Sequence, residues 1–395
     1  MRRTLFETEH EDFRATVGSF LDREMVPQQA KWSAQGHIDR SCFESAGRLG
    51  LLGVAAPEEL GGGGVDDFRY NVVLNEEIHA RGLNGPGLGF TLHNDIVLPY
   101  LLKFADTEQQ RRWLPAMCDG TAIGAVAMTE PGAGSDLAAI GTEARREGDH
   151  YVVNGSKTFI SNGINADVVV TAVKTDPTQR HRGMSLLVLE RGMAGFERGR
   201  RLEKVGLHAQ DTAELSFVDV IAPVANRLGE EGEGFTLLAE CLVQERLSIA
   251  VTAIAAARAA LEGTVAYVRD RELFGRTLAE FQNARFVLAD IATEVEIGQV
   301  YVDRAVSEHM AGELTPSSAA KAKWWTTELQ KSVVDKCVQL HGGYGYMLET
   351  PIGRAYQDAR ITTIYGGATE VMKEIIARSL LPGSTVPRVH SKQGR

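Results

Sequence analysis

Apolar residues in the first third of the chain recur with the spacing of an α-helix. Phe13, Val17, Phe20 and Leu21 fall on one helical face, and residues 43–54 (FESAGRLGLLGV) repeat the pattern. Four consecutive glycines within residues 57–67 indicate a loop, because glycine is costly inside a helix. Residues 1–120 are therefore predicted to form an α-helical domain.

The pattern changes at Thr121. Short runs rich in β-branched and apolar residues follow, among them HYVVNG, KTFIS, DVVVTAV and MSLLVLE, and turn sequences separate them. Such runs predict a small antiparallel barrel or sandwich over residues 121–230. The alternating helices of a dinucleotide-binding sheet are missing from this stretch.

From Glu231 to about residue 380 the helical spacing returns, in segments long enough for a bundle. The predicted fold class is α+β with three domains: helices over 1–120, an antiparallel β barrel or sandwich over 121–230, and a helical bundle over 231–382. We expect residues 383–395 to form a disordered tail.

Composition narrows the class of partner. The 395 residues are 44% apolar and 24% charged, and their net charge of −10 argues against a nucleic-acid partner. The longest apolar run, residues 247–257, ends at Arg258 and is too short to span a membrane. Four widely spaced cysteines suit a reduced compartment. We therefore expect a soluble cytoplasmic protein.

Common catalytic motifs are absent. The sequence has no HExxH, GxSxG or GxxxxGK[ST], and its ten histidines form no convincing metal-ligand pair. One stretch is more informative: AMTEPGAGSD (127–136) places two glycines and two hydroxyl side chains in a turn that suits an anion. The segment KTFISNG follows about 25 residues later.

These segments belong to a series of motifs that resembles the acyl-CoA dehydrogenase family over nearly all of residues 1–382. Within it, the resemblance is greatest to the long-chain and isovaleryl types. The motifs are PEELGGGG (57–64), AMTEPGAGSDL (127–137), NGSKTFISNG (154–163), GLHAQDTAELSF (206–217), RELFGRTLAEFQ (271–282), QLHGGYGY (339–346) and IYGGATEVMKEIIAR (364–378).

The resemblance implies that FAD is bound between the β domain and the bundle. Matches to the contacts within one subunit are Met128, Thr129, Gly134, Ser135, Phe159, Ile160, Ser161, Ala368, Thr369 and Glu370. Matches to contacts supplied to the FAD of a neighbouring subunit are Arg271, Phe274, Gln282, Gln339, Leu340, His341, Gly342 and Gly343. Ala368 replaces the usual threonine and removes one hydroxyl from these contacts.

The resemblance also implies a catalytic carboxylate that removes the α-proton of an acyl thioester. Many members place it in a YEGT-like motif, where this chain has Gly366. The long-chain and isovaleryl types place it in a QER or LER context instead, which Glu245 in CLVQERLSIA (241–250) matches. We expect the space left by Gly366 to admit branched chains. Predicted substrate contacts are Ser135, Thr236, Val243, Gln244, Arg246, Gly366 and Gly367.

The implied function is FAD-dependent α,β-dehydrogenation of an acyl-CoA, with an electron-transfer flavoprotein as electron acceptor and a homotetramer as the assembly. Three alternatives stay open from the sequence: a dehydrogenase for acyl groups on an acyl carrier protein, a flavin oxidase or monooxygenase on the same fold, and a non-catalytic FAD-binding scaffold.

Overall fold

A computed structural model describes residues 1–381 of the chain. The N-terminal domain is helical. Its last helix begins with a capping box in which Asp106 and Gln109 each accept a hydrogen bond from the other's backbone N–H. The helices are α1 (Thr8–Phe20), α2 (Gln29–Gln35), α3 (Arg40–Arg48), α4 (Arg69–Ala80), α5 (Asn84–Thr91), α6 (Leu98–Phe104) and α7 (Thr107–Cys118).

The middle of the chain forms a sheet in the order β6-β7-β3-β2-β4-β5-β8, with β1 paired to β4. Most pairs are antiparallel, but β1 runs parallel to β4, and one residue pair joins β2 to β4 in parallel. The sheet is therefore mixed, whereas the sequence predicted an antiparallel one. The strands are β1 (Gly124–Ala127), β2 (Glu143–Glu147), β3 (His150–Ser161), β4 (Val168–Lys174), β5 (Met184–Glu190), β6 (Phe196–Arg201), β7 (Thr212–Pro223) and β8 (Arg227–Leu228).

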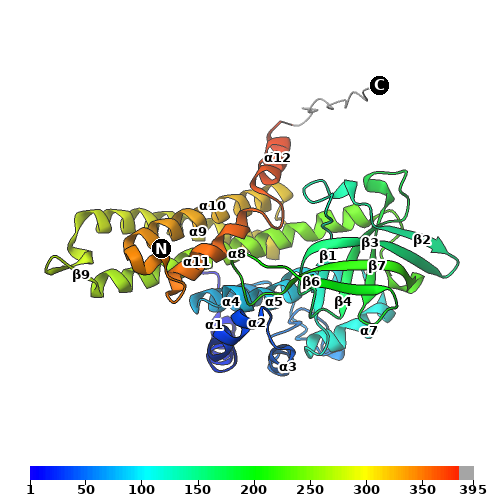
Figure 1. Cartoon of the computed structure of the whole chain (residues 1–395), viewed down its shortest axis with the longest axis horizontal. Coiled ribbons are helices and arrows are strands. Elements are labelled where there is room, and N and C mark those ends of the chain that lie inside the picture. Colours follow the sequence, from blue (N-terminus) through cyan, green and yellow to red (C-terminus); the bar gives the residue numbers. More distant parts are fainter. Residues whose placement is uncertain (382–395) are drawn as a thin grey trace.

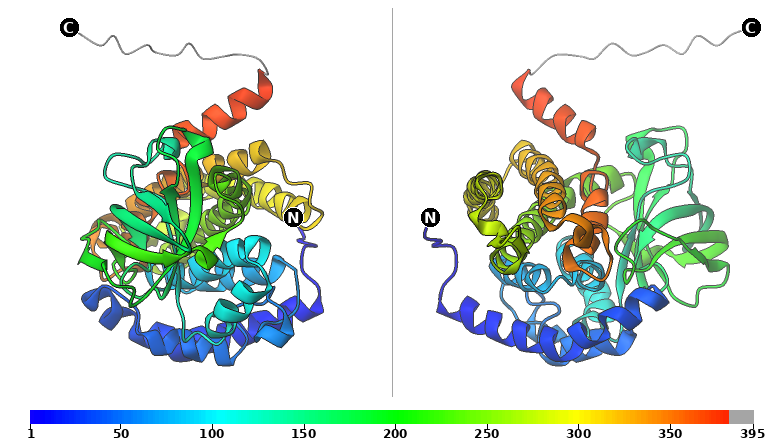
Figure 2. Two further views of the ribbon diagram at one scale, coloured as in Figure 1. Left: turned by 90° about the vertical axis from the view of Figure 1, so that its right-hand side faces the viewer. Right: turned by 60° about the vertical axis from the view of Figure 1, so that its left-hand side comes forward.

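The C-terminal part is a helical bundle. Figure 1 shows the bundle reaching away from the sheet, and Figure 2 shows the N-terminal helices as a layer beneath both. Its helices are α8 (Gly234–Asp270), α9 (Gln282–Met310), α10 (Pro316–His341), α11 (Pro351–Ala359) and α12 (Thr369–Leu380), and a short hairpin, β9 (Glu272–Leu273) with β10 (Arg276–Thr277), joins α8 to α9. The predicted order of helices, β domain and helical bundle is confirmed; residues 382–395 lie outside the described part.

Helix α8 connects the two halves of the molecule. Its first turns, through Leu238 and Cys241, pack into the core shared with the sheet, whereas Leu247 and Val251 belong to the core of the bundle. Glu245 stands between these two cores. Within the described residues, α8 is also the only helix long and apolar enough to cross a membrane, but 61% of its most apolar window is buried in the protein, as in a core helix.

Candidate active site

A cavity of about 1120 Å³ opens where the sheet, α8 and the start of α12 meet. Apolar side chains of α5 and the following helical stretch Leu92–Val97 line one side, among them Leu88 and Ile96. The ends of β1 and β3 line another. The turn between residues 363 and 369 closes the cavity beside α8. Its volume exceeds that of most single-ligand sites, so there is room for two extended molecules.

Glu245 is a buried carboxylate in the wall of this cavity. Its side chain is only 9% exposed, and its Oε2 has no hydrogen-bond partner among the described residues. Burial raises the pKa of Glu245 to about 7, although the charges of Arg246 and Lys323 act in the opposite direction. A carboxylate tuned close to neutral pH is suited to accept a proton. Glu240, one turn earlier, is exposed and lies 3.5 Å from Lys103.

Gly366 lies next to Glu245, in the turn between Arg360–Thr363 and α12. Its φ of +61° is a left-handed conformation that favours glycine. A Cβ added there would lie 3.7 Å from Glu245 Oε1 but only 2.2 Å from Ile249 Cδ1. The space left by the missing side chain is thus occupied by Ile249, contrary to the open space that we expected.

The β domain contributes the opposite wall. Lys157 of β3 forms a buried ion pair of 2.8 Å with Glu130 and donates to the Met128 carbonyl oxygen, which ties β3 to the end of β1. A register shift follows between Lys157 and Ile160, and Phe159 adopts a φ of +61° with 67% of its surface exposed. An exposed aromatic ring held in a strained backbone is a common feature of ligand sites.

Most of the predicted site residues meet in this cavity. Those that line it are Met128, Thr129, Gly134, Ser135, Phe159, Ile160, Ser161, Glu245, Arg246, Gly366, Gly367, Ala368 and Glu370. Thr369 does not line it, because its hydroxyl donates to Glu328 at 2.7 Å.

Three predicted substrate contacts also lie elsewhere. The cavity face of α8 carries Phe235, Leu238, Ala239, Leu242, Glu245, Arg246, Ser248, Ile249 and Thr252, which follow helical spacing. Thr236, Val243 and Gln244 are off this face. The side-chain amide of Gln244 instead donates to the Asp95 carbonyl oxygen and contacts His309. None of these three residues lines the cavity, because sequence neighbours of Glu245 are not its neighbours on the face of the helix.

A second group of predicted cofactor residues lies far from the cavity. Arg271 and the segment Gln339–Gly343 line a separate cavity of about 610 Å³ at the end of α10. The other end of the same helix, at Pro316, lines the first cavity. A helix of 26 residues is about 39 Å long, so one flavin in one subunit cannot contact both groups. Phe274 and Gln282 are exposed at this distal end.

Sequence reasoning missed Ile249 and the residues of α5. Ile249 follows Glu245 by one helical turn, so the helical period would have found it. It also missed Lys323, because a lysine within an amphipathic helix is usually a surface residue.

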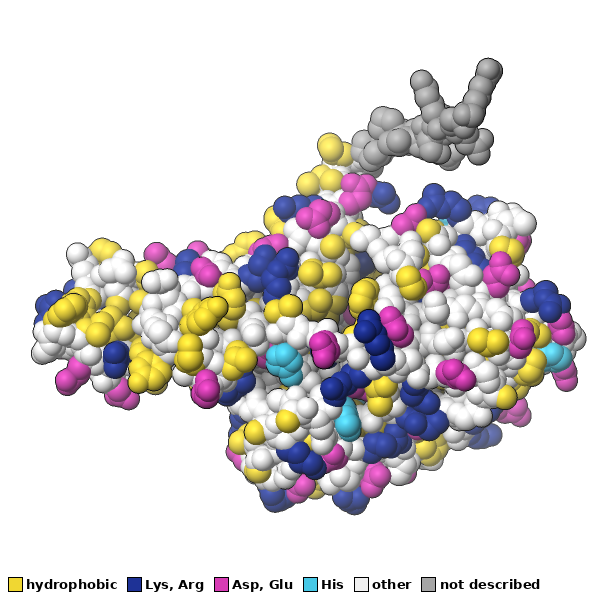
Figure 3. All heavy atoms as spheres, in the orientation of Figure 1, with side chains coloured by type: hydrophobic (Ala, Val, Ile, Leu, Met, Phe, Trp, Pro, Cys, Tyr) yellow, Lys and Arg dark blue, Asp and Glu magenta, His cyan; other side chains and the backbone are white. Residues whose placement is uncertain are grey.

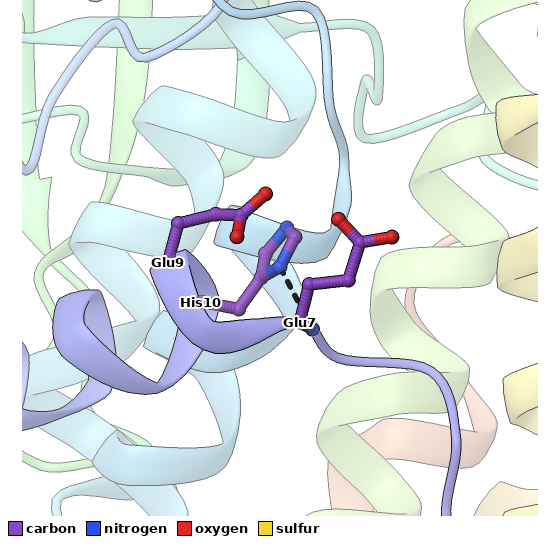
Figure 4. A group of neighbouring side chains, drawn as sticks. All are labelled: Glu7, Glu9 and His10. Atoms are coloured by element: carbon purple, nitrogen blue, oxygen red, sulfur yellow. Dashed lines mark hydrogen bonds between the residues drawn. The ribbon is translucent and has the colours of Figure 1, made fainter.

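A cluster of Glu7, Glu9 and His10 lies outside the cavity, at the start of α1 (Figure 4). His10 Nδ1 accepts a hydrogen bond from the Glu7 N–H at 3.2 Å, and its Nε2 lies 3.2 Å from Asp67 Oδ2. Both ring nitrogens are therefore engaged within the protein. We assign no metal to this cluster.

Comparisons with known proteins agree with this geometry. Models of the N-terminal, middle and C-terminal domains of acyl-CoA dehydrogenases match residues 7–121, 125–220 and 232–381. The chain is 45% identical to the mitochondrial long-chain specific acyl-CoA dehydrogenase of Sus scrofa, over 96% of this chain and 88% of that protein.

Two solved structures extend the comparison. An acyl-CoA dehydrogenase from Geobacillus kaustophilus is 50% identical, with a TM-score of 0.93 over 95% of this chain and 98% of the other. A glutaryl-CoA dehydrogenase from Mycobacterium smegmatis in complex with FADH2 is 27% identical, with a TM-score of 0.89 over 97% of each chain. The matches do not favour the alternatives left open by the sequence. The chain belongs to the acyl-CoA dehydrogenase family and is a flavin-dependent oxidoreductase that acts on acyl-CoA thioesters.

Proposed function

We propose that Glu245 is the base that removes the α-proton of an acyl-CoA bound in the cavity. The observation that carries this proposal is a buried carboxylate in the cavity wall whose Oε2 has no hydrogen-bond partner among the described residues. The adjacent residue in the turn is Gly366, which has no side chain that could act as the base instead. Loss of the α-proton to Glu245 and of the β-hydrogen as hydride gives the 2-enoyl thioester. Bound flavin supplies the acceptor for that hydride.

Other residues of the chain assist the proton transfer. Apolar side chains that line the cavity, such as Leu92 and Leu242, exclude water from the acyl chain and strengthen electrostatic interactions at the reacting carbons. The backbone N–H of Gly366 has no acceptor among the described residues, so it is free to donate to the thioester carbonyl as negative charge develops there. In this proposal Arg246 holds the CoA part of the substrate.

The same proposal assigns the flavin as FAD. The exposed ring of Phe159 and the small residues Gly134 and Ser135 in the opposite wall are compatible with a flat ring system beside an anionic group. The glutaryl-CoA dehydrogenase that this chain resembles was solved with FADH2. Arg271 is suited to grip a pyrophosphate because a guanidinium offers two parallel donors.

The distal position of Arg271 supports an oligomer in which each FAD is contacted by two subunits. Figure 3 shows hydrophobic side chains gathered on the arm of the bundle. Several large apolar side chains there are exposed, including Phe274, Phe286, Ile297, Tyr344 and Tyr346. Exposed apolar area of this kind is typical of a subunit interface. We propose a homotetramer with an electron-transfer flavoprotein as its electron acceptor.

Two parts of the proposal rest on other support. A long acyl chain is proposed because the Sus scrofa relative is specific for long chains and because the cavity is large and mostly apolar. A cytoplasmic location stays a prediction, with which four free, buried cysteines are compatible.

The experiment is anaerobic addition of straight, branched and long acyl-CoAs to the purified flavoprotein while the flavin absorbance is followed. We expect bleaching in the wild type and in Glu240→Gln, the exposed neighbour, but a loss of about 10²- to 10⁴-fold in rate for Glu245→Gln, as expected when a base is removed. The proposal fails if no acyl-CoA bleaches the wild type, or if Glu245→Gln bleaches at the wild-type rate.

A further inference from the structure

Lys323 is a buried lysine beneath the turn that carries Gly366. It lies on α10 with an exposure of 0%, and its Nζ donates to the Gly367 carbonyl oxygen at 2.7 Å. It does not line the cavity, whereas Gly366 and Gly367 do. Any effect of Lys323 on the reaction therefore acts through these neighbours.

The ammonium of Lys323 has no contacting carboxylate. Among the described residues, no acidic side chain forms an ion pair with it within 4 Å, although a buried cation normally requires such a partner. Its charge is attracted instead by Glu245 and Glu328 over a longer distance. Glu328 is already bound by the Thr369 hydroxyl and by Lys331, at 2.7 Å and 3.0 Å. Of the two carboxylates, only that of Glu245 has an oxygen without a hydrogen-bond partner among the described residues.

We propose that Lys323 is a positioning residue for proton transfer: its ammonium holds the Gly366–Gly367 turn against Glu245 and stabilises the ionised carboxylate. The inference rests on the proposed role of Glu245 as the base.

The charges around Lys323 fix the direction of its effect. Arg246 and Glu245 face it from α8, Glu328 lies on its own helix, and Tyr365 stands in the turn. Burial raises the pKa of Glu245, whereas the positive charges of Arg246 and Lys323 lower it. Burial lowers the pKa of Lys323 to about 8, so the lysine is still protonated in the range where Glu245 titrates. Removal of its charge therefore raises the pKa of Glu245.

Three variants separate charge from hydrogen bonding. Lys323→Met removes both the charge and the donor, Lys323→Gln keeps a donor for the Gly367 carbonyl without the charge, and Lys321→Met removes an exposed lysine from the same helix. The measurement is the pH dependence of the second-order rate constant for anaerobic bleaching of the flavin by an acyl-CoA.

We expect the acidic limb of this profile to move up by about one pH unit in both Lys323 variants and to stay in place in Lys321→Met. A second readout uses a 3-thia acyl-CoA, in which sulfur replaces the β-carbon so that the α-proton can leave but no hydride can. Its α-anion, seen as long-wavelength absorbance beside the oxidised flavin, should need a higher pH in both Lys323 variants.

The inference is overturned if the acidic limb of a folded Lys323 variant stays at the wild-type pH while the rate constant falls by the same factor at every pH. Such a result is expected if Lys323 has only a structural role. Lys323→Gln provides this test if Lys323→Met does not fold. Failure of the proposed function would look different, because Glu245→Gln would then bleach as fast as the wild type. An inactive Glu245→Gln together with an unmoved limb in Lys323→Gln refutes only the role of Lys323.

Discussion

Gly366 and Ile249 show how the loss of one side chain is compensated by a neighbour. At Gly366 the chain has no carboxylate, and the left-handed backbone makes any other residue costly. Ile249, one turn from Glu245 on α8, fills the space. The proposed base thus lies on a rigid helix and the adjacent turn supplies only backbone, which is an arrangement suited to holding a base in place.

Gly366→Ala tests this pairing. We expect the substitution to cost about 1–3 kcal/mol through backbone strain alone, and more through the overlap with Ile249 Cδ1. Adding Ile249→Val removes that methyl group. The double variant should regain the stability lost through the overlap but not the stability lost through backbone strain. The unfolding temperature measures both effects.

Gly263→Ala is the control for Gly366→Ala, because it lies within α8 where an added Cβ meets nothing within 4 Å. It should raise stability slightly, since alanine is the better helix former. An unchanged unfolding temperature in Gly366→Ala would contradict the account.

Helix α8 presents a regular face to the cavity, which in the proposed function is one wall of the acyl channel. Its cavity face is a stripe of residues three and four apart, and neighbouring residues in the sequence point elsewhere. Leu242 is on this stripe, whereas Val243 is not, and both are half-buried.

Leu242→Ala should therefore change the ratio of kcat/KM between short and long acyl-CoAs by several-fold, because it reshapes the channel by about one side chain. Val243→Ala is the matched control and should leave the ratio unchanged. The measurement is kcat/KM of both variants over a series of straight-chain acyl-CoAs. Equal changes in both variants would show that the residues of this stripe do not determine the chain-length preference.

The sequence predicted some features of the fold and of the candidate site but not others. The order of domains followed from periodicity, whereas Glu245 was proposed from the resemblance of its QER context to the long-chain and isovaleryl types. The parallel pairing of β1 with β4 could not be predicted, because it joins segments about 40 residues apart and alternation within a strand does not encode its partner. Lys323 was missed because its burial depends on the turn at residues 365–367, which packs over α10 only in the folded chain.

At the scale of the whole molecule, the residues assigned to the cofactor lie at both ends of α10. Arg271 is at the distal end, about 28 Å along α8 from Thr252 of the cavity, so its proposed contact with FAD would require a second subunit. In the proposed assembly, retention of the cofactor would therefore depend on association of the subunits.

Arg271→Ala should accordingly lower the FAD content of the purified protein without unfolding the subunit, because the residue is exposed in the single chain. Arg269→Ala removes a nearby exposed arginine that does not line the distal cavity and should retain a full complement of FAD. Flavin content per subunit after gel filtration measures the difference. Equal flavin content in the two variants would argue against contact across subunits.

The role of Glu245 as the base can be measured through the pH dependence of anaerobic flavin reduction at sub-saturating acyl-CoA, because this rate reports the free enzyme. Only the ionised carboxylate accepts a proton, and the pKa of Glu245 is raised to about 7 by burial. We therefore expect a rate that rises with pH through about 7, is about tenfold below its plateau at one pH unit below this value, and is lost in Glu245→Gln. A rate that does not vary between about pH 5.5 and 9, or one that survives in Glu245→Gln, would contradict it.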